Sequence, residues 1–281
     1  MTARKTKVPR LIGRWTAVKL EHLDHYLQAY AIASKRSLER SYIDAFAGCG
    51  DCVLEDTGDP VEGSALRALR AVPAFTEYHF IEIDPAAAQH LRSKVGSHHR
   101  VTVYTGDCNV LLPAEVLGRV SRRSASLAFL DPTGLQLHWN TVVALASHRM
   151  GPRRMELLIL YPYDMAIDAR LFNPPIHPAL TKFFGADSGW DLQLAESRRL
   201  DENRDQRRER FVRFYCDRLR GLGYQHVDHC GPLYDEHNNP LYYVVFASDH
   251  PVGAKIMKRE WQATRFVPGE LGHKPVKRPV S

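Results

Sequence analysis

Short apolar runs alternate with segments of helical periodicity between residues 15 and 161. The runs are rich in β-branched and aromatic residues and predict strands at Ser41–Phe46, Tyr78–Ile83, Val101–Thr105, Ser126–Leu130 and Leu157–Tyr161. Segments in which apolar residues recur every three or four positions predict helices at 15–34, 64–71, 86–95, 111–120 and 139–148. Near-continuous apolar strands that alternate with helices predict a parallel sheet that is covered on both faces.

Two later runs, 224–230 and 241–248, predict a different arrangement. The segment that joins them contains Asn238 and Pro240 and is too short for a crossover helix, so the two strands should pair antiparallel. Between the fifth strand and this hairpin lies an insert, 162–223, in which a charged helix is expected at 195–219. The prediction is an α/β fold with a seven-stranded, mostly parallel sheet, an antiparallel terminal hairpin and a helical insert.

The charge of the chain is distributed unevenly. The net charge is +6, but residues 1–14 carry five basic and no acidic side chains, and residues 251–281 carry seven Lys or Arg and two Glu. The body, 15–250, is therefore mildly acidic, at −4. Two interpretations of the basic ends stay open: solvated tails, or contacts with nucleic acid or an acidic partner. We expect one domain at 15–261 between a basic N-terminal tail, 1–14, and a C-terminal tail, 262–281.

The charged helix has the same two interpretations. Over 196–220 it holds nine Arg and six acidic residues, which is typical of a solvated, salt-bridged face. A surface that docks a partner or an RNA backbone is the alternative.

The apolar runs and the cysteine count indicate the compartment in which the protein is expected. No apolar run approaches the roughly 18 residues of a membrane span, and no apolar segment of the secretory type follows the basic N-terminus. The five cysteines are odd in number, so we expect a reducing compartment, the cytoplasm, rather than a disulfide scaffold. Cys49 and Cys52 form a lone C-x-x-C, which is a weak metal signal, so no metal site is predicted.

The first strand carries the strongest local signal. It reads Tyr42-Ile-Asp-Ala-Phe-Ala-Gly-Cys-Gly50, a strand that ends in Asp44 and enters a turn with Gly48 and Gly50. Glycines there allow the backbone to approach a ligand closely, and cofactors bind at the carboxyl ends of such strands. The full G-x-G-x-x-G is missing, so a nicotinamide dinucleotide is not favoured. A strand-ending turn without a ligand is the alternative.

The next two strands end in carboxylates as well. Phe80-Ile-Glu-Ile-Asp-Pro85 offers Glu82, which can accept hydrogen bonds from both hydroxyls of a ribose, while Asp84 suits a helix cap. Gly106-Asp107-Cys108 places Asp107 where it can accept from an adenine amine. A solvated strand end or a turn aspartate explains each of these alone.

The fourth strand stops at Asp131-Pro132-Thr133-Gly134. The proline fixes the direction of the loop, so Asp131 either orients a substrate nucleophile or belongs to an ordinary turn. Four polar strand ends at one edge of a sheet favour the functional interpretation.

Taken in order, these motifs resemble a class I S-adenosylmethionine-dependent methyltransferase with a Rossmann-like fold. More closely, from Trp15 to about Trp261, the chain resembles the three-Cys-motif partner family. The motifs that carry this resemblance are Trp15-x3-Lys19-x-Glu21, Tyr42–Gly48, Glu62-Gly-Ser-Ala-Leu66, Phe80–Glu82, Phe129-Leu-Asp-Pro-x-Gly-Leu135 and Phe246-Ala-Ser-x-His-Pro-x-Gly253.

The resemblance implies a cofactor and a partner. S-adenosyl-L-methionine would be the cofactor, with Asp44, Gly48 and Gly50 facing its methionine moiety, Glu82 its ribose and Asp107 its adenine. Phe46 and Cys108, their neighbours in the chain, are assigned to the same site. The partner would be a separate radical-enzyme-like protein that carries the cysteine motif, so Cys49 and Cys52 are not credited with that role.

Asp131 and Thr133 are the predicted catalytic residues. The sulfonium already activates the methyl group, so the protein mainly aligns donor and nucleophile, and a carboxylate such as Asp131 can orient or deprotonate an amine or hydroxyl. Enzymes that methylate amino groups of nucleic-acid bases usually follow this Asp-Pro with a second Pro and an aromatic residue that stacks the base. Thr133 and Gly134 occupy those places here, which disfavours base methylation. A non-catalytic accessory subunit of the partner is the other alternative.

Overall fold

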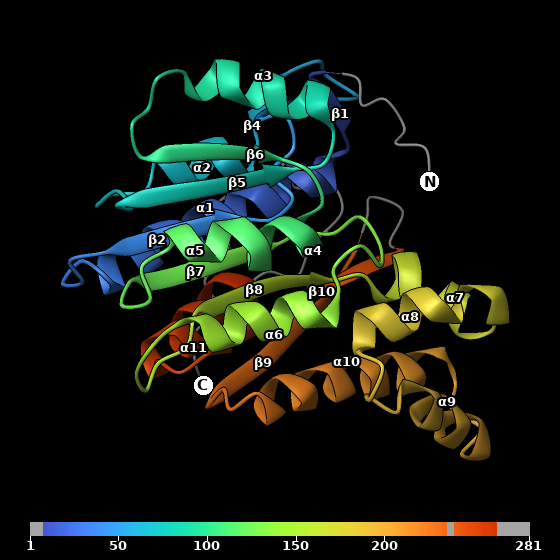
Figure 1. Cartoon of the computed structure of the whole chain (residues 1–281). Helices are drawn as coiled ribbons and strands as arrows, with labels where there is room; N and C mark the ends of the chain where they lie inside the picture. Colours follow the sequence, from blue (N-terminus) through green and yellow to red (C-terminus); the bar gives the residue numbers. More distant parts are fainter. Residues whose placement is uncertain (1–7, 235–238, 263–281) are drawn as a thin grey trace, which may run out of the picture.

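The structure is a computed structural model that describes residues 8–234 and 239–262 (Figure 1). Its centre is a seven-stranded sheet in the order β6-β5-β2-β7-β8-β10-β9, and a three-stranded sheet in the order β1-β3-β4 lies beside it. The strands are β1 (Arg10–Ile12), β2 (Arg40–Asp44), β3 (Asp51–Leu54), β4 (Pro60–Glu62), β5 (Glu77–Glu82), β6 (Val101–Thr105), β7 (Ala125–Leu130), β8 (Glu156–Tyr161), β9 (His226–Tyr234) and β10 (Pro240–Ser248).

The five strands from β6 to β8 are parallel, and β10 pairs antiparallel with both β8 and β9. This arrangement is the Rossmann-like α/β fold of class I methyltransferases, so the predicted fold class is confirmed. The chain moves outward from β2 in one direction through β5 to β6, and in the other through β7 to β8. The reversal of direction beside β2 is the position where open α/β sheets bind ligands.

Helices cover both faces of the large sheet (Figure 1). They are α1 (Arg14–Ala33), α2 (Ser64–Leu69), α3 (Pro85–Val95), α4 (Cys108–Leu111), the π-helical η1 (Leu112–Val116), α5 (Leu117–Arg119), α6 (Trp139–His148), η2 (Tyr163–Ile167), α7 (Asp168–Leu171), the 3₁₀ turn η3 (Pro174–Ile176), α8 (His177–Phe184), α9 (Trp190–Arg199), α10 (Arg204–Gly221), α11 (Pro251–Met257) and η4 (Lys258–Gln262).

Alternate residues of the strands contribute to two separate hydrophobic cores. In β7, Leu127 and Phe129 join the core under α1, α2 and α11, whereas Ala128 and Leu130 join the core under α6, α8 and α10. Because successive side chains of a strand point to opposite faces, a strand buried on both faces must be apolar throughout. This is why the strands read as near-continuous apolar runs.

The described part of the predicted N-terminal tail contains a strand. Residues 10–12 form β1, which pairs parallel with β3, and β3 pairs antiparallel with β4. The small sheet therefore connects the start of the chain to the segment that follows the Gly48–Gly50 turn. Neither region was predicted to contain a strand from the sequence pattern.

The predicted charged helix at 195–219 is wrong as a single element. The chain forms α9 and α10, separated by a turn in which Asp201 has a positive φ of 51°. Asn203 and Gln206 start α10 with a reciprocal capping box, because the Asn203 side chain accepts from the Gln206 N–H and the Asn203 N–H donates to the Gln206 side chain. The apolar periodicity continues through both helices, but the capping box at Asn203 starts a new helix at Arg204.

The insert lies beside α6 and the carboxyl end of β8 (Figure 1). It begins with η2 directly after β8 and ends with α10 before β9. Within the described ranges, no helix is both long and apolar enough to cross a membrane.

Candidate functional site

The candidate site lies at the carboxyl ends of four neighbouring parallel strands, β6, β5, β2 and β7 (Figure 1). Asp107, Glu82, Asp44 and Asp131 stand at these four ends, either as the last residue of the strand or within two residues of it. The parallel register therefore brings the predicted site carboxylates to one edge of the sheet.

Asp44 is fully buried at the end of β2. Its Oδ1 accepts a hydrogen bond of 3.2 Å from the Phe46 N–H, whereas its Oδ2 has no hydrogen-bond partner among the described residues. Burial raises the pKa of Asp44 to about 7, the charges of Asp131 and Glu82 act in the same direction, and the Ser64 hydroxyl and the Phe46 N–H oppose the shift. A buried carboxylate oxygen without a donor is suited to a ligand that brings a donor or a positive charge.

The two turn glycines have different environments. Both have positive φ, 64° at Gly48 and 89° at Gly50, a conformation that side chains disfavour. A Cβ added at Gly48 would meet no atom within 4 Å, whereas one at Gly50 would lie 2.8 Å from the Leu91 Cδ1. Gly50 therefore permits close packing inside the protein, and Gly48 leaves open space beside the site.

Glu82 links this turn to the end of β5. Its Oε2 accepts a hydrogen bond of 2.8 Å from the Gly48 N–H, and its Oε1 accepts one of 2.8 Å from the Asp84 N–H. Both oxygens are thereby oriented, and each retains a second acceptor position for a ligand hydroxyl. Asp84 caps α3 by accepting from the N–H groups of Ala86 and Ala87, which confirms its expected capping role.

Asp107 caps α4 and also orients a neighbour that the sequence analysis missed. Its Oδ1 accepts from the Asn109 N–H and from the Asn109 side-chain amide, each at 2.8 Å. The Asn109 amide in turn donates to the Gln136 carbonyl and accepts from the His138 N–H. Asn109 thus connects the end of β6 to the loop after β7, and the Asp-x-Asn spacing was the signal for this turn.

Asp131 forms a buried ion pair with Lys19 of α1. The Lys19 Nζ lies 2.5 Å from the Asp131 Oδ2, and the two side chains are only 7% and 19% exposed. Lys19 precedes Asp131 by 112 residues in the chain, and the sequence indicated it only as part of the family motif Trp15-x3-Lys19. The predicted catalytic carboxylate is therefore held and oriented by a cation.

Two aromatic residues surround that ion pair. The Lys19 Nζ lies 5.1 Å from the centre of the Trp15 ring, and Trp15 stacks on Tyr242 of β10 with 5.4 Å between ring centres. Burial raises the pKa of Tyr242, with the charge of Asp131 acting in the same direction and Arg10 against it. Helix α1 and strand β10 therefore bring Lys19, Trp15 and Tyr242 to the Asp131 side of the site.

Thr133, the second predicted catalytic residue, is exposed, and its hydroxyl accepts a 2.8 Å hydrogen bond from the Gln136 amide. Phe46 is half-buried and packs against a hydrophobic core. Cys108 is buried, and burial raises the pKa of its thiol to about 12. These three residues lie near the strand ends, but nothing in their contacts distinguishes them as functional groups.

Cys49 and Cys52 are free thiols in the small sheet region. The Cys49 thiol donates to the Asp51 carbonyl, and burial raises the pKa of Cys52 to about 11. A high pKa keeps a thiol protonated at neutral pH and weakly reactive. Among the residues that the structure describes, no group of three His, Cys, Asp or Glu side chains is arranged to hold a metal ion.

Comparisons with known proteins bear on the fold alone. No family model and no curated protein matches the chain. Similar solved structures include M. jannaschii TYW2 in complex with AdoMet, with 11% identity, 84% of this chain and 75% of that chain covered, and a TM-score of 0.39. Trm1 from Pyrococcus horikoshii with S-adenosyl-L-methionine has 13% identity, 87% and 57% coverage, and a TM-score of 0.44. A Legionella pneumophila protein has 13% identity, 90% and 94% coverage, and a TM-score of 0.49.

Proposed function

We propose that this protein is an S-adenosylmethionine-dependent methyltransferase. The observation that carries the proposal is the environment of Asp44, a fully buried carboxyl with one oxygen lacking a hydrogen-bond partner in the described structure. It lies beside a glycine turn whose Gly48 faces open space and is bonded to Glu82. A ligand with a positive charge and a diol would satisfy these groups together.

S-adenosylmethionine has the chemistry that these residues require. Its ammonium and sulfonium groups suit the negative charge shared by Asp44 and its neighbours, and its ribose hydroxyls suit the second acceptor positions of Glu82. Asp107 stands at the next strand end, where it would accept from the adenine amine. When bound, the cofactor supplies an electrophilic methyl group.

The chain's own contribution to the reaction is positioning. Lys19 holds the Asp131 carboxylate at the end of β7, and the ion pair keeps that carboxylate directed while it accepts a hydrogen bond from the N–H or O–H of the acceptor. Alignment of two reactants in one site supplies much of the rate enhancement in a displacement of this kind. Trp15 lies beside Lys19 and stacks on Tyr242, so aromatic rings flank the cation that holds Asp131.

The finer proposal concerns a partner. The motifs of the three-Cys-motif partner family support a pairing with a separate radical-enzyme-like protein, on whose product or substrate the methyl group would act. An accessory role without catalysis is the competing function. Methylation of nucleic-acid bases is disfavoured by Thr133 and Gly134, which replace the proline and aromatic residue expected for base stacking.

Calorimetric titration with S-adenosylmethionine tests the core of the proposal. The wild-type protein should bind it, and Glu82→Ala should weaken binding by roughly 1–3 kcal/mol because the ribose loses a charged acceptor. Glu55→Ala is the matched control, since Glu55 is an exposed acid in the turn after β3. A folded wild-type protein that does not bind the cofactor would exclude the methyltransferase function.

The partner and the acceptor require a second experiment. The protein should be purified from its own cells with any associated protein, and the complex incubated with methyl-labelled S-adenosylmethionine and a cell extract. Label transfer that disappears in Asp131→Asn supports catalysis by this chain. Binding of the cofactor without label transfer under any condition favours the accessory role.

A further inference from the structure

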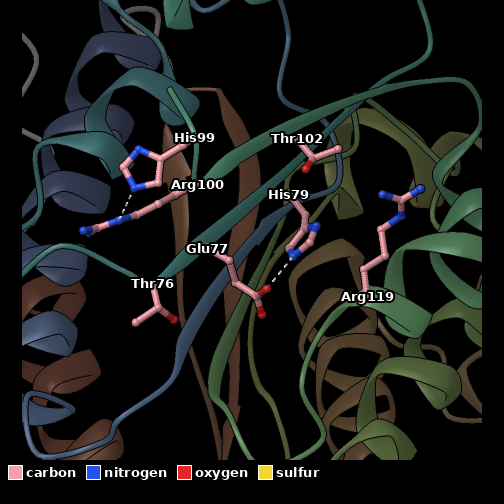
Figure 2. A pocket seen from close by; sticks show the side chains of 7 residues that line it. All are labelled: Thr76, Glu77, His79, His99, Arg100, Thr102 and Arg119. Carbon is pink, nitrogen blue, oxygen red and sulfur yellow. Dashed lines mark hydrogen bonds and ion pairs between the residues drawn. The ribbon is translucent and has the colours of Figure 1, made fainter. Parts of the chain in front are cut away.

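A second polar site lies at the opposite end of β5 and β6 from the candidate methyltransferase site. A cavity of about 430 Å³ is lined by seven residues: Thr76, Glu77, His79, His99, Arg100, Thr102 and Arg119 (Figure 2). Glu77 begins the strand that Glu82 ends, and five residue steps along a strand span about 16 Å. The cavity is therefore separate from the carboxyl-end site.

The cavity wall consists of hydrogen-bonding side chains. Ligand sites for drug-like molecules are mostly apolar with a few polar groups, whereas all seven residues here carry a hydroxyl, carboxylate, imidazole or guanidinium group. A ligand that matches this wall must itself be polar over most of its surface. Its size is limited by the volume, which falls within the range of sites for small metabolites.

Two arginines provide positive charge from different elements. Arg100 comes from the loop before β6 and Arg119 from α5, and Figure 2 shows them on opposite sides of Glu77 and His79. Arg119 pairs with Glu115 at 3.2 Å, and Arg100 makes long contacts of 3.3 Å with the His99 Nε2 and 3.5 Å with the Phe75 carbonyl. A guanidinium has five N–H donors, so both keep donors for an anion, and the planar fork of donors matches the geometry of a phosphate.

Glu77 and His79 form the inner wall of the cavity. The buried Ser41 hydroxyl donates to the Glu77 Oε1, and the His79 Nε2 lies 3.6 Å from the Glu77 Oε2. Burial acts to raise the pKa of Glu77, but the neighbouring His79 imidazole and the Ser41 hydroxyl lower it below its usual value, so the carboxylate is ionised at neutral pH.

His79 is the second, independent indication of a ligand. It is only 3% exposed, and its Nδ1 is 3.0 Å from the Tyr104 hydroxyl. Its Nε2 faces the Glu77 Oε2 at 3.6 Å, which is longer than an ordinary hydrogen bond, and it has no closer partner within the described ranges. A buried ring N–H beside an ionised carboxylate is suited to a ligand hydroxyl that accepts from the Nε2 and donates to Glu77.

We infer that this cavity binds a small sugar phosphate, whose phosphate is attracted by the flanking arginines, Arg100 and Arg119, while Glu77 and His79 form hydrogen bonds with the sugar hydroxyls. The carboxylate would repel a bare phosphate, whereas a hydroxyl-bearing ester places donors against Glu77 and its anion against the arginines. The sugar phosphate can be free or part of a mononucleotide, since both present the same groups. This site is independent of the proposed methyl transfer.

Titration calorimetry with ribose 5-phosphate tests the inference, with adenosine 5′-monophosphate, inorganic phosphate and ribose as parallel probes. The wild-type protein should bind ribose 5-phosphate with a Kd of about 1 mM or lower and more tightly than either phosphate or ribose. Arg119→Gln and Arg100→Gln should each weaken binding about tenfold or more, and Arg123→Gln, an exposed arginine four residues beyond Arg119, should leave it unchanged. Tighter binding of the mononucleotide with the same variant pattern identifies a nucleotide as the source.

The location is tested by competition and by Glu77→Gln. A saturating amount of S-adenosylhomocysteine should not displace ribose 5-phosphate, because the two sites lie at opposite strand ends. Glu77→Gln should weaken ribose 5-phosphate more than inorganic phosphate. Absence of binding to a folded wild-type protein, equal losses in Arg123→Gln and Arg119→Gln, or displacement by S-adenosylhomocysteine would each overturn the inference.

Discussion

Burial of Asp44 favours its protonated form, whereas its proposed role beside a cationic cofactor requires the carboxylate. It is fully buried, its nearest charged neighbours include Asp131 and Glu82, and its pKa rises from 3.8 to about 7. Without a ligand the folded protein therefore holds a proton on Asp44 over much of the acidic range. A cation bound beside it would favour the ionised form.

The first prediction follows from this linkage. Cofactor binding near pH 6 should release a proton from Asp44, because the sulfonium and ammonium groups stabilise the carboxylate. Calorimetry at one pH in two buffers of different ionisation enthalpy measures this release, and Asp44→Asn should abolish it. Equal binding enthalpies in the two buffers for the wild-type protein would contradict the assignment.

The same shift predicts how the unliganded protein's stability depends on pH. The contribution of Asp44 to folding is fully present below its unfolded pKa of 3.8 and is lost as pH rises through about 7, with a slope of up to about 1.4 kcal/mol per pH unit. Denaturant unfolding of Asp44→Asn should show a flatter profile across this window. Glu156, whose pKa is raised by burial to about 7, supplies a slope that remains in the variant.

At the scale of elements, α1 is connected to the strand ends through one buried ion pair. Lys19 pairs with Asp131 at the carboxyl end of β7, and Trp15 lies against both Lys19 and Tyr242. Helix α1 therefore couples the β10 side of the sheet to the loop after β7. The sequence pattern predicted the helix but not this connection.

Lys19→Met should lower the free energy of unfolding by roughly 1–3 kcal/mol, because it leaves Asp131 partly buried without its cation. Adding Asp131→Asn to Lys19→Met should recover part of that loss, which a double-mutant cycle measures as a coupling energy. Lys35→Met, at an exposed lysine beyond the end of α1, is the control. Additive effects of the Lys19 and Asp131 substitutions would show that the pair contributes no coupling.

The element-scale errors of the sequence analysis have local causes. The strand at 10–12 is only three residues long, and its pairing partner β3 lies beyond the glycine turn, so neither segment has a recognisable period of its own. The break between α9 and α10 depends on one capping box and one residue with positive φ. Periodicity continues across such a break, because it reports which residues are buried and not where the backbone turns.

At the scale of the whole molecule, an arginine–aspartate network joins the beginning of the insert to its last helix, α10. The Asp164 side chain of η2 is only 2% exposed and contacts Arg204 and Arg208 of α10. Arg208 donates two hydrogen bonds of 2.8 Å to the Asp164 carboxylate. Arg204 and Arg207 pair with Asp168. The charged face that the sequence analysis described as solvated or partner-binding is thus partly used inside the protein.

Asp164→Asn should destabilise the protein by about 3 kcal/mol, since it removes the charge that compensates a buried guanidinium. Asp205→Asn is a close control, because Asp205 also pairs with Arg208 but its side chain is 82% exposed, so its loss should change stability by no more than about 0.5 kcal/mol. Thermal unfolding compares the two variants, and hydrogen exchange of α10 should rise only in Asp164→Asn. Similar effects of both substitutions would show that the network does not hold the two ends of the insert together.

The sequence by itself determined the sheet, the strand-end carboxylates and the helical insert. Strands buried on both faces must be apolar, and polar residues that interrupt them fall at strand ends, so both patterns are visible along the chain. Asp44, Glu82, Asp107 and Asp131 were found in this way. Only the tertiary structure decided that Lys19 pairs with Asp131, that Glu82 holds the Gly48 turn, and that Glu77 and His79 line a cavity with Arg119. These contacts join residues of different strands and helices, and a pattern along the chain does not show which of them meet in the folded protein.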